Sequence, residues 1–374
     1  RKLLASITVT SNAAGVAEDG VVTLNEAILS ANANAAVNAD VVASGTYGVD
    51  QIDFNIPGTG QVTITDSALP AITDTLTING YSQPGSSANT LGDGTLEDGT
   101  NAVIGVRLSG SPLVVQAEAS AIKGLALTDN PLGTALLVSA NNVTIAGNFI
   151  GTADGTNAAG NAVGVSIADD VSGTVIGTTM AADRNLISGN ATGVAVLGDL
   201  SIIENNLIGP NASGTLALVG SAPVAPTEAG VYVIGGTGNR IGGSTAEEGN
   251  VIAFNQGDGV LVDNTTTTAT VIGANNIYNN EGLGIDILPD GMTPNDTNDP
   301  DGVQNFPTLM GARQTSGGQL DVELLFNSRN LGTYTIDFFA NDATDASGFG
   351  EGQVYLGSRT VSTDGTGNYG ATLT

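Results

Sequence analysis

Two short phrases recur through the middle of this 374-residue sequence, and their spacing restricts the fold more than any other feature. One is an asparagine followed by a short aliphatic run, beginning at Asn148, Asn185, Asn206, Asn239, Asn250 and Asn276. The other is a glycine followed by alternating aliphatic residues, beginning at Gly164, Gly193, Gly230, Gly259 and Gly284. Successive glycine phrases therefore start 29, 37, 29 and 25 residues apart. Self-similarity at such a spacing predicts a repeat fold in which each phrase is one strand of a coil.

The phrases are too short to close a sandwich by themselves, but stacked coils bury the aliphatic face of each strand against the next. Glycine supplies 53 of the 374 residues, and both glycine and asparagine tolerate the positive φ that tight corners require. Stacked asparagine side chains also hydrogen-bond along such an axis. We therefore expect an all-β solenoid, with loops inserted at corners over residues 152–162 and 210–228.

The N-terminal region predicts a cap for this solenoid. Residues 7–10 alternate as a strand, and Thr23 with Glu26 forms the sequence signature of a capping box that opens a helix over residues 24–32. A solenoid exposes unpaired apolar surface at its first coil, so a covering helix is expected there. Less regular strands are expected near residues 51–56, 61–65, 75–79, 102–109 and 120–128.

The pattern changes after residue 286, where a stretch rich in Pro, Gly and Asp runs to Gly302. Longer alternating strands follow at residues 319–326, 333–340, 354–362 and 369–373, as is typical of a small antiparallel sandwich. The expected organisation is a solenoid with its cap over 1–290, a linker over 291–307 and a sandwich over 308–374. The last unit is shorter than the ~100 residues of a complete sandwich, so we expect one strand to be missing.

Composition excludes several functional classes. The chain has no Cys and no His, which excludes zinc fingers, iron–sulfur clusters, disulfides and Ser-His-Asp triads. Nine Lys and Arg against 37 Asp and Glu give a net charge of −28, which argues against nucleic acids and anionic membranes as partners. No apolar run approaches ~18 residues, so no transmembrane segment is expected.

The combined pattern resembles right-handed parallel β-helix proteins of bacterial surfaces. Residues 148–151, 164–167 and 184–190 carry the resemblance, which covers roughly residues 100–290. The strand and helix at the N-terminus resemble the CSLREA-type segment that begins such proteins. Residues 334–340 and 356–361 resemble the Ig-like modules that follow them. The resemblance implies the right-handed coil and a secreted or cell-surface location.

The linker supplies the best candidates for a metal site. Carboxylate and amide oxygens, which Ca²⁺ prefers, are concentrated at Asp286, Asp290, Asn295, Asp296, Asn298, Asp299 and Asp301. The spacing does not match an EF-hand, which needs a Glu at its twelfth position. Two interpretations stay open: a Ca²⁺ site that stiffens the joint between the domains, or a solvated acidic linker. No other cofactor is expected.

Catalysis is less favoured, although many β-helices act on polysaccharides. Asp169 and Asp170 are the only adjacent aspartates, and a solvated turn explains them better than a pair of catalytic carboxylates. Arg184 and Arg240 precede strands, where structural roles in turns are expected. The chain lacks Trp, so aromatic platforms for sugars are scarce. We therefore expect no catalytic residues.

Assembly is the remaining possibility. An incomplete sandwich exposes a sheet edge, which is a template for another strand. The apolar residues 3–10 are one candidate to complete the sandwich of a neighbouring subunit, and head-to-tail contacts of that kind build filaments or rings. Truncation is the alternative explanation for the missing strand. The expected function is that of an extracellular structural or adhesive protein that self-assembles into a filament, sheath or surface layer. A polysaccharide-active enzyme or a β-helix that binds surface glycans is the alternative.

Overall fold

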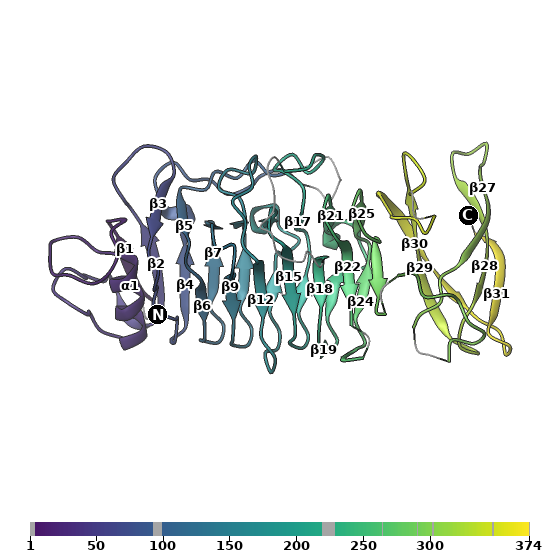
Figure 1. The fold of residues 1–374 in the computed structure, drawn as a ribbon, viewed down its shortest axis with the longest axis horizontal. Coiled ribbons are helices and arrows are strands. Elements are labelled where there is room, and N and C mark those ends of the chain that lie inside the picture. The colour runs from purple at the N-terminus through teal and green to yellow at the C-terminus, as the bar shows by residue number, and fades with distance from the viewer. Residues whose placement is uncertain are drawn as a thin grey trace.

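Most of the computed structural model consists of three parallel sheets, and the strands of each sheet stack along one axis (Figure 1). The structure describes residues 4–92, 99–218, 229–263, 265–289, 291–300, 303–345 and 348–373. Over this part of the chain, successive coils each contribute short strands to the sheets, so that neighbours in a sheet come from neighbouring coils. The prediction of an all-β parallel β-helix is confirmed.

The nine-stranded sheet runs in the order β1 (Leu4–Val9), β2 (Thr46–Phe54), β4 (Leu76–Asn79), β7 (Ala121–Lys123), β10 (Thr144–Ala146), β13 (Val175–Ile176), β16 (Ile202–Ile203), β20 (Arg240–Gly242) and β24 (Val271–Gly273). The eight-stranded sheet runs β3 (Val62–Thr65), β5 (Val106–Ser109), β8 (Leu125–Thr128), β11 (Phe149–Ile150), β14 (Leu186–Ile187), β17 (Leu207–Ile208), β21 (Val251–Ala253) and β25 (Asn276–Tyr278). The seven-stranded sheet runs β6 (Leu113–Val115), β9 (Thr134–Val138), β12 (Val163–Ile167), β15 (Thr192–Val196), β18 (Ala229–Val233), β22 (Asp258–Val262) and β26 (Ile285–Ile287).

Short strands and 3₁₀ turns lie at the corners of the coils. The strands β19 (Gly236–Thr237) and β23 (Thr267–Thr268) pair with each other, and single 3₁₀ turns occur at η1 (Gly80–Ser82), η2 (Ala181–Asp183) and η3 (Ala246–Glu248). No helix in the described ranges is long and apolar enough to cross a membrane.

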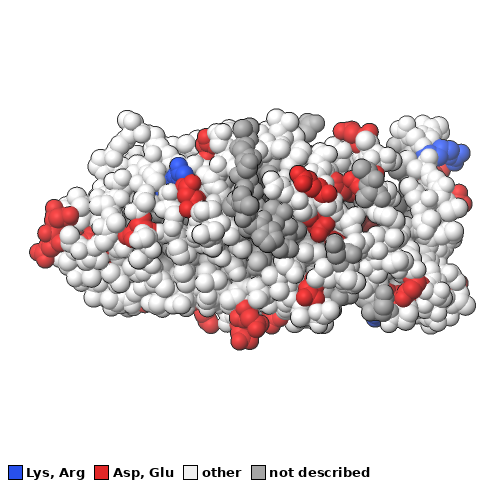
Figure 2. All heavy atoms as spheres, in the orientation of Figure 1, with Lys and Arg blue, Asp and Glu red and all other residues white. Residues whose placement is uncertain are grey.

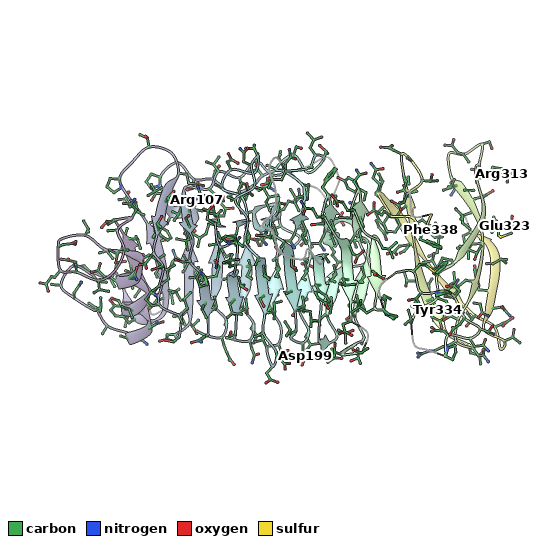
Figure 3. All side chains as sticks on the ribbon, in the orientation of Figure 1. Arg107, Asp199, Arg313, Glu323, Tyr334 and Phe338 are labelled. Carbon is green, nitrogen blue, oxygen red and sulfur yellow. The ribbon has the colours of Figure 1, made fainter. Side chains whose placement is uncertain are left out.

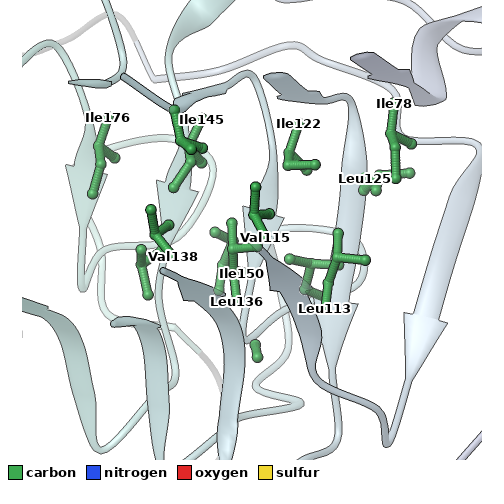
Figure 4. Packing of buried hydrophobic residues seen from close by; sticks show 14 of the residues in the cluster. Ile78, Leu113, Val115, Ile122, Leu125, Leu136, Val138, Ile145, Ile150 and Ile176 are labelled. Atoms are coloured by element: carbon green, nitrogen blue, oxygen red, sulfur yellow. The ribbon is translucent and has the colours of Figure 1, made fainter. Parts of the chain in front are cut away.

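The core consists of columns of aliphatic side chains that point inward at equivalent positions of successive coils (Figure 4). In the nine-stranded sheet, the register pairs Ile52, Ile78, Ile122, Ile145, Ile176, Ile203 and Ile241 in one such column. These side chains are at most 1% exposed. The alternation read from the sequence therefore assigns inward and outward positions correctly, because a period of two fixes which side chains enter the core.

An asparagine ladder runs along the axis at one corner. The side-chain Nδ2 of Asn148 donates to Oδ1 of Asn185 at 3.1 Å, and the chain continues through Asn206, Asn250 and Asn275 at 2.8, 3.0 and 2.8 Å. Each of these asparagines is at most 3% exposed. The predicted stacking is thus confirmed for four of the six phrase-opening asparagines, whereas Asn239 bonds to Gly198 and Ser201 elsewhere and the ladder ends at Asn275 instead of Asn276. The ladder satisfies buried amides that would otherwise destabilise the fold.

The helix α1 (Leu24–Ala33) lies at the N-terminal end of the solenoid (Figure 1). Its N-cap Thr23 and its third-position Glu26 form the predicted capping box. Glu26 is fully buried, and its carboxylate also accepts hydrogen bonds from the Ala17 amide at 2.9 Å and from Asn38 Nδ2 at 2.7 Å. One glutamate therefore fixes both the helix and the loops that precede and follow it.

The strand β1 corrects one expectation. Residues 4–9 are not a free terminal strand, because they pair in parallel with β2 and bury Ala5, Ile7 and Val9 in the core. Ser6 also exchanges backbone hydrogen bonds with Ser44 on the opposite edge. Donating this segment to a neighbouring subunit would require removing the first strand of its own solenoid, while Leu3 lies outside the described residues.

Long loops form an outer layer over the eight-stranded sheet. Outward-facing Phe149, Leu186 and Leu207 pack under these loops in a second apolar cluster. The Thr100 amide donates to the Ala212 carbonyl at 2.7 Å, and Ala212 in turn donates to the Gly155 carbonyl at 2.8 Å. The insertions expected near 152–162 and 210–228 are therefore packed loops as far as residue 218, and residues 219–228 lie outside the described part.

The C-terminal strands form two antiparallel sheets. One contains β27 (Thr308–Gln314), β28 (Leu320–Asn327) and β31 (Asn368–Leu373), and the other contains β29 (Thr333–Ala340) and β30 (Val354–Ser362). Their shared core is formed by Val322, Leu324, Phe326, Ile336 and Val361. The sequence had predicted β28 to β31 but missed β27, whose seven residues are all exposed.

Candidate functional site

The linker residues proposed as metal ligands are held by different parts of the chain. Asp286 lies in β26, is 1% exposed and accepts the Gly291 amide at 3.0 Å. Asn295 exchanges hydrogen bonds with Phe306, and the Asp296 backbone does so with Asn305. These contacts tie the linker to the residues that follow it.

Two further linker residues contact the sandwich. The Asn298 amide donates to Asn327 Oδ1 at 2.8 Å, and Asp299, which is 5% exposed, accepts Ser328 Oγ at 3.3 Å. Arg329 lies 3.5 Å from the Asp299 carboxylate. Asp290 and Asp301 lie outside the described residues. Over the residues described, no three acidic side chains converge as a metal site would require, so the Ca²⁺ prediction stays untested.

A cleft of about 410 Å³ lies beside the linker on the sandwich. It is lined by Asp299, Gln304, Arg329, Asn330, Gly332, Thr333 and Tyr334. The nearby Tyr334 and Phe326 rings meet edge to face, with centroids 5.0 Å apart (Figure 3 labels Tyr334). The Asp299–Arg329 pair leaves this cleft with a compensated charge, which suits a polar neutral group better than a bare ion.

A second cleft, of about 340 Å³, lies on the solenoid between the outer loops. It is lined by Gly60, Gln61, Pro84, Gly85, Ala102, Val103, Ile104, Gly105, Phe149, Ala153 and Asp154. Gln61 Nε2 donates to the carbonyls of Ile104 at 3.0 Å and Ala153 at 2.9 Å, so its amide fixes two walls. Val103 is 50% exposed and gives the cleft an apolar rim.

Asp154 supplies the carboxylate of this solenoid cleft. Desolvation opposes its ionisation, but hydrogen bonds from Thr156 and Asn157 outweigh that effect and lower the pKa of Asp154. The group is therefore ionised at neutral pH, and it can accept hydrogen bonds but not donate a proton. Such a carboxylate beside an apolar wall is suited to binding hydroxyl groups rather than to acid catalysis.

The arginines of the solenoid serve its structure. Arg184 is 5% exposed, and it donates to the Gly99 carbonyl at 2.8 Å and to Asn205 Oδ1 at 2.7 Å, which holds the outer loop down. Arg240 bridges Glu204 and Glu248 at 2.7 and 3.1 Å. The structural roles expected for both residues agree with these contacts.

The carboxylates near Arg240 are also structural. Glu248 accepts the backbone amides of Ser244 and Thr245, and the first of these bonds is the main cause that lowers the pKa of Glu248. Asp169 and Asp170 lie in an exposed turn after β12, where Asp169 Oδ1 accepts the Asp170 amide at 3.0 Å. The aspartate pair is therefore a turn, as expected.

The acidic surface is dispersed. On the face in view in Figure 2, acidic side chains occur as separate patches on a largely uncharged surface. Where arginine is exposed, it often has an acidic neighbour, as in the Arg107–Asp129 and Arg313–Asp321 pairs (Figure 3 labels both arginines). The net charge is thus spread along the rod and does not form one continuous tract on this face.

Sequence reasoning missed both clefts. The solenoid cleft combines residues from four separate stretches between Gly60 and Asp154, and no local motif unites them. A signal was present only in the unequal spacing of the repeats, which predicted inserted loops but not where they would pack.

Neither a protein-family model nor a curated protein matches this sequence. Among solved structures, the crystal structure of the Dettilon tailspike protein is similar over 85% of this chain and 84% of its own length. The sequence identity is 13% and the TM-score is 0.24. A similarity this low supports no argument about the function of the chain.

Proposed function

We propose that this protein is an extracellular structural or adhesive component, in which the solenoid acts as a stiff spacer. The observation that carries the proposal is the continuous asparagine ladder, which links five coils through buried side-chain hydrogen bonds. Strands in a sheet lie ~4.8 Å apart, so the nine-stranded sheet extends roughly 40 Å along the axis. The asparagines at equivalent positions of successive coils therefore join the coils and stiffen the solenoid along that axis.

The finer family assignments belong to the same proposal. The buried Glu26, with its three loop and cap contacts, supports a CSLREA-type N-terminal cap. The facing sheets of three and two strands support an Ig-like module. Dispersed negative charge suits a protein that stays soluble outside the cell.

Self-assembly into a filament, sheath or layer is the part of the proposal that needs a partner. The exposed edge strand β27, with Leu309 and Met310 at 64% and 57% exposure, is an available edge for strand addition. Because β1 is engaged in its own solenoid, the added strand would come from another segment.

Electron microscopy of the purified protein, together with light scattering, tests the structural proposal. Filaments, sheets or a homo-oligomer at micromolar concentration are the expected result. A protein that stays monomeric across concentration and salt would contradict assembly, and hydrolysis or lyase activity on a polysaccharide panel would contradict the structural role.

A glycan-binding solenoid is the second candidate, favoured by the 340 Å³ cleft with its ionised Asp154 and apolar rim. A glycan array distinguishes it from the first. If the cleft binds surface glycans, Asp154→Asn and Val103→Asp weaken binding, whereas Asp170→Asn, on a distant exposed turn, leaves it unchanged.

A further inference from the structure

At the C-terminal end of the solenoid, an asparagine donates to the sandwich the hydrogen bonds that an asparagine of the preceding coil donates to its neighbour in the next coil. In the preceding coil, the backbone amide and Nδ2 of Asn255 both donate to Oδ1 of Asn280, at 3.1 and 2.8 Å. Asn280 repeats this pair of donations at 3.2 and 2.8 Å, but its acceptor is Oε1 of Glu351. This row of asparagines is separate from the ladder that ends at Asn275, and a glutamate of the C-terminal sandwich takes the place that the asparagine of a further coil would take in it.

Three more contacts continue the same substitution. The Ala274 amide donates to Asp337 Oδ2 at 2.9 Å, and the Ile277 amide donates to the Gly352 carbonyl at 2.8 Å. The Tyr355 amide donates to Asn276 Oδ1 at 3.0 Å. Ile277 and Gly352 form an antiparallel bridge, so the segment 351–355 lies along β25 where another coil would lie.

We propose that the sandwich serves as the terminal coil of the solenoid, and that Asp337 and Glu351 make this joint a hinge that closes as the pH falls. Both carboxylates are at the interface, and both accept backbone amides from the end of the solenoid. The proposal concerns the joint alone and is independent of any filament or glycan.

The electrostatic surroundings of the hinge favour neutral acids. Burial raises the pKa of Glu351, and Asp345 adds to this, while hydrogen bonds from Asn280 and Asn279 oppose it. Burial likewise raises the pKa of Asp337 against the hydrogen bond from Ala274. The solenoid loop against Glu351 carries Glu281 and rests on Asp258, both acidic.

Arginine gives little compensation at this end. Arg240 lies one strand further in, on β20 beside β24, and it is already paired with Glu204 and Glu248. The described residues of β24 and β25 carry no Lys or Arg of their own.

The direction of the pH effect follows from the raised values. A carboxyl group whose pKa is higher in the docked state binds its proton more tightly there, so protonation favours docking. Docking is fully supported below the ordinary values of 3.8 and 4.5 and weakens as the pH rises through the raised values. The joint is therefore expected to be closed near pH 4 and partly open at neutral pH.

The cysteine-free chain allows a direct test by single-molecule energy transfer. Leu132→Cys on the solenoid and Leu331→Cys on the sandwich provide label sites that are 95% and 77% exposed. The full chain should give one narrow distance distribution at pH 4 and a second, broader population at pH 8. A distribution that is identical at both pH values would overturn the hinge.

Variants separate the acceptor role from the charge. Glu351→Gln keeps an oxygen acceptor for Asn280 without the charge and should shrink the broad population at pH 8, while Asp337 keeps the remaining pH dependence. Glu351→Ala should broaden the distribution at both, and should speed amide exchange at Asn280 by about tenfold. The exposed Glu323→Gln in the same module should behave like the parent. If Glu351→Ala stays docked, with exchange unchanged, the terminal-coil proposal is wrong; circular dichroism confirms that each variant is folded.

Discussion

Replacing Asn206 by alanine should destabilise the solenoid more than replacing any exposed asparagine. Asn206 is 1% exposed and lies in the middle of the ladder. Its Nδ2 donates to the carbonyls of Ile176 and Glu204, both at 2.8 Å, and to Asn250 Oδ1 at 3.0 Å. Its Oδ1 accepts Asn185 Nδ2 at 2.8 Å.

The magnitude follows from these contacts. Each hydrogen bond contributes about 1 kcal/mol net, and a buried donor left without an acceptor costs about 1–3 kcal/mol. Two acceptors keep another donor after the substitution. The Ile176 carbonyl still accepts the Glu204 backbone amide, and Asn250 Oδ1 still accepts the backbone amide of residue 206. The Asn185 amide group loses one acceptor. The expected loss in the free energy of unfolding is therefore about 3–5 kcal/mol.

Urea unfolding followed by far-ultraviolet circular dichroism measures this loss, since the chain has no Trp for fluorescence. Asn157→Ala, on an exposed loop, is the matched control and should change stability by no more than about 0.5 kcal/mol. If Asn206→Ala unfolds at the same urea concentration as Asn157→Ala, the ladder does not stabilise the solenoid and the reasoning fails.

Gly209 has a φ of 102°, and an added Cβ would overlap the Ala253 carbonyl, so Gly209→Ala should lower the free energy of unfolding by about 2–5 kcal/mol. Gly311→Ala, with open space around the added Cβ, is the control and should leave it unchanged, and equal thermal midpoints for the two variants would contradict this prediction. Burial opposes ionisation of Asp129, but hydrogen bonds from Ser109, Thr128 and Arg107 lower its pKa, so its stabilising contribution is present above the ordinary value of 3.8 and lost as the pH falls through the lowered one. Because Asp129 is 40% exposed, Asp129→Asn should remove less than about 1 kcal/mol at pH 7 and progressively less as the pH falls below 3.8, and a loss that does not shrink at all with falling pH would exclude the charge as its cause. If the linker binds Ca²⁺, a hundredfold excess over Kd should stabilise the folded state by about 2.7 kcal/mol and raise the melting temperature above that measured in EDTA. Asp299→Asn should reduce this rise, and an unchanged melting curve would favour the solvated linker.

The sequence was most informative where structure repeats. Asn185, Asn206 and Asn250 could be placed at equivalent corners because each begins the same phrase, and the structure joins them in one ladder. The inward columns followed from alternation alone. The capping box at Thr23 and Glu26 was equally readable, because its two contacts lie within one turn.

The parts that the sequence did not predict depend on contacts between distant segments. No local sequence pattern marks Glu351, because its partner Asn280 lies 71 positions away in the chain. Strand β27 has no buried face, so its pattern of Leu309, Met310 and Arg313 carries no alternation. The linker looked like one cluster of oxygen ligands, but the sandwich holds Asn298 and Asp299, while Asp286 stays with the solenoid.

The outer loop layer has a consequence for how the chain folds. In a simple solenoid each coil contacts only its neighbours, so folding can begin anywhere and spread along the axis. Here Asn89 donates to the Ala181 carbonyl across 92 positions, and Thr100 reaches Ala212. The early loops cannot reach their final packing until those later coils exist. The middle of the protein should therefore gain its full stability in one late cooperative step, more slowly than a repeat array of the same length.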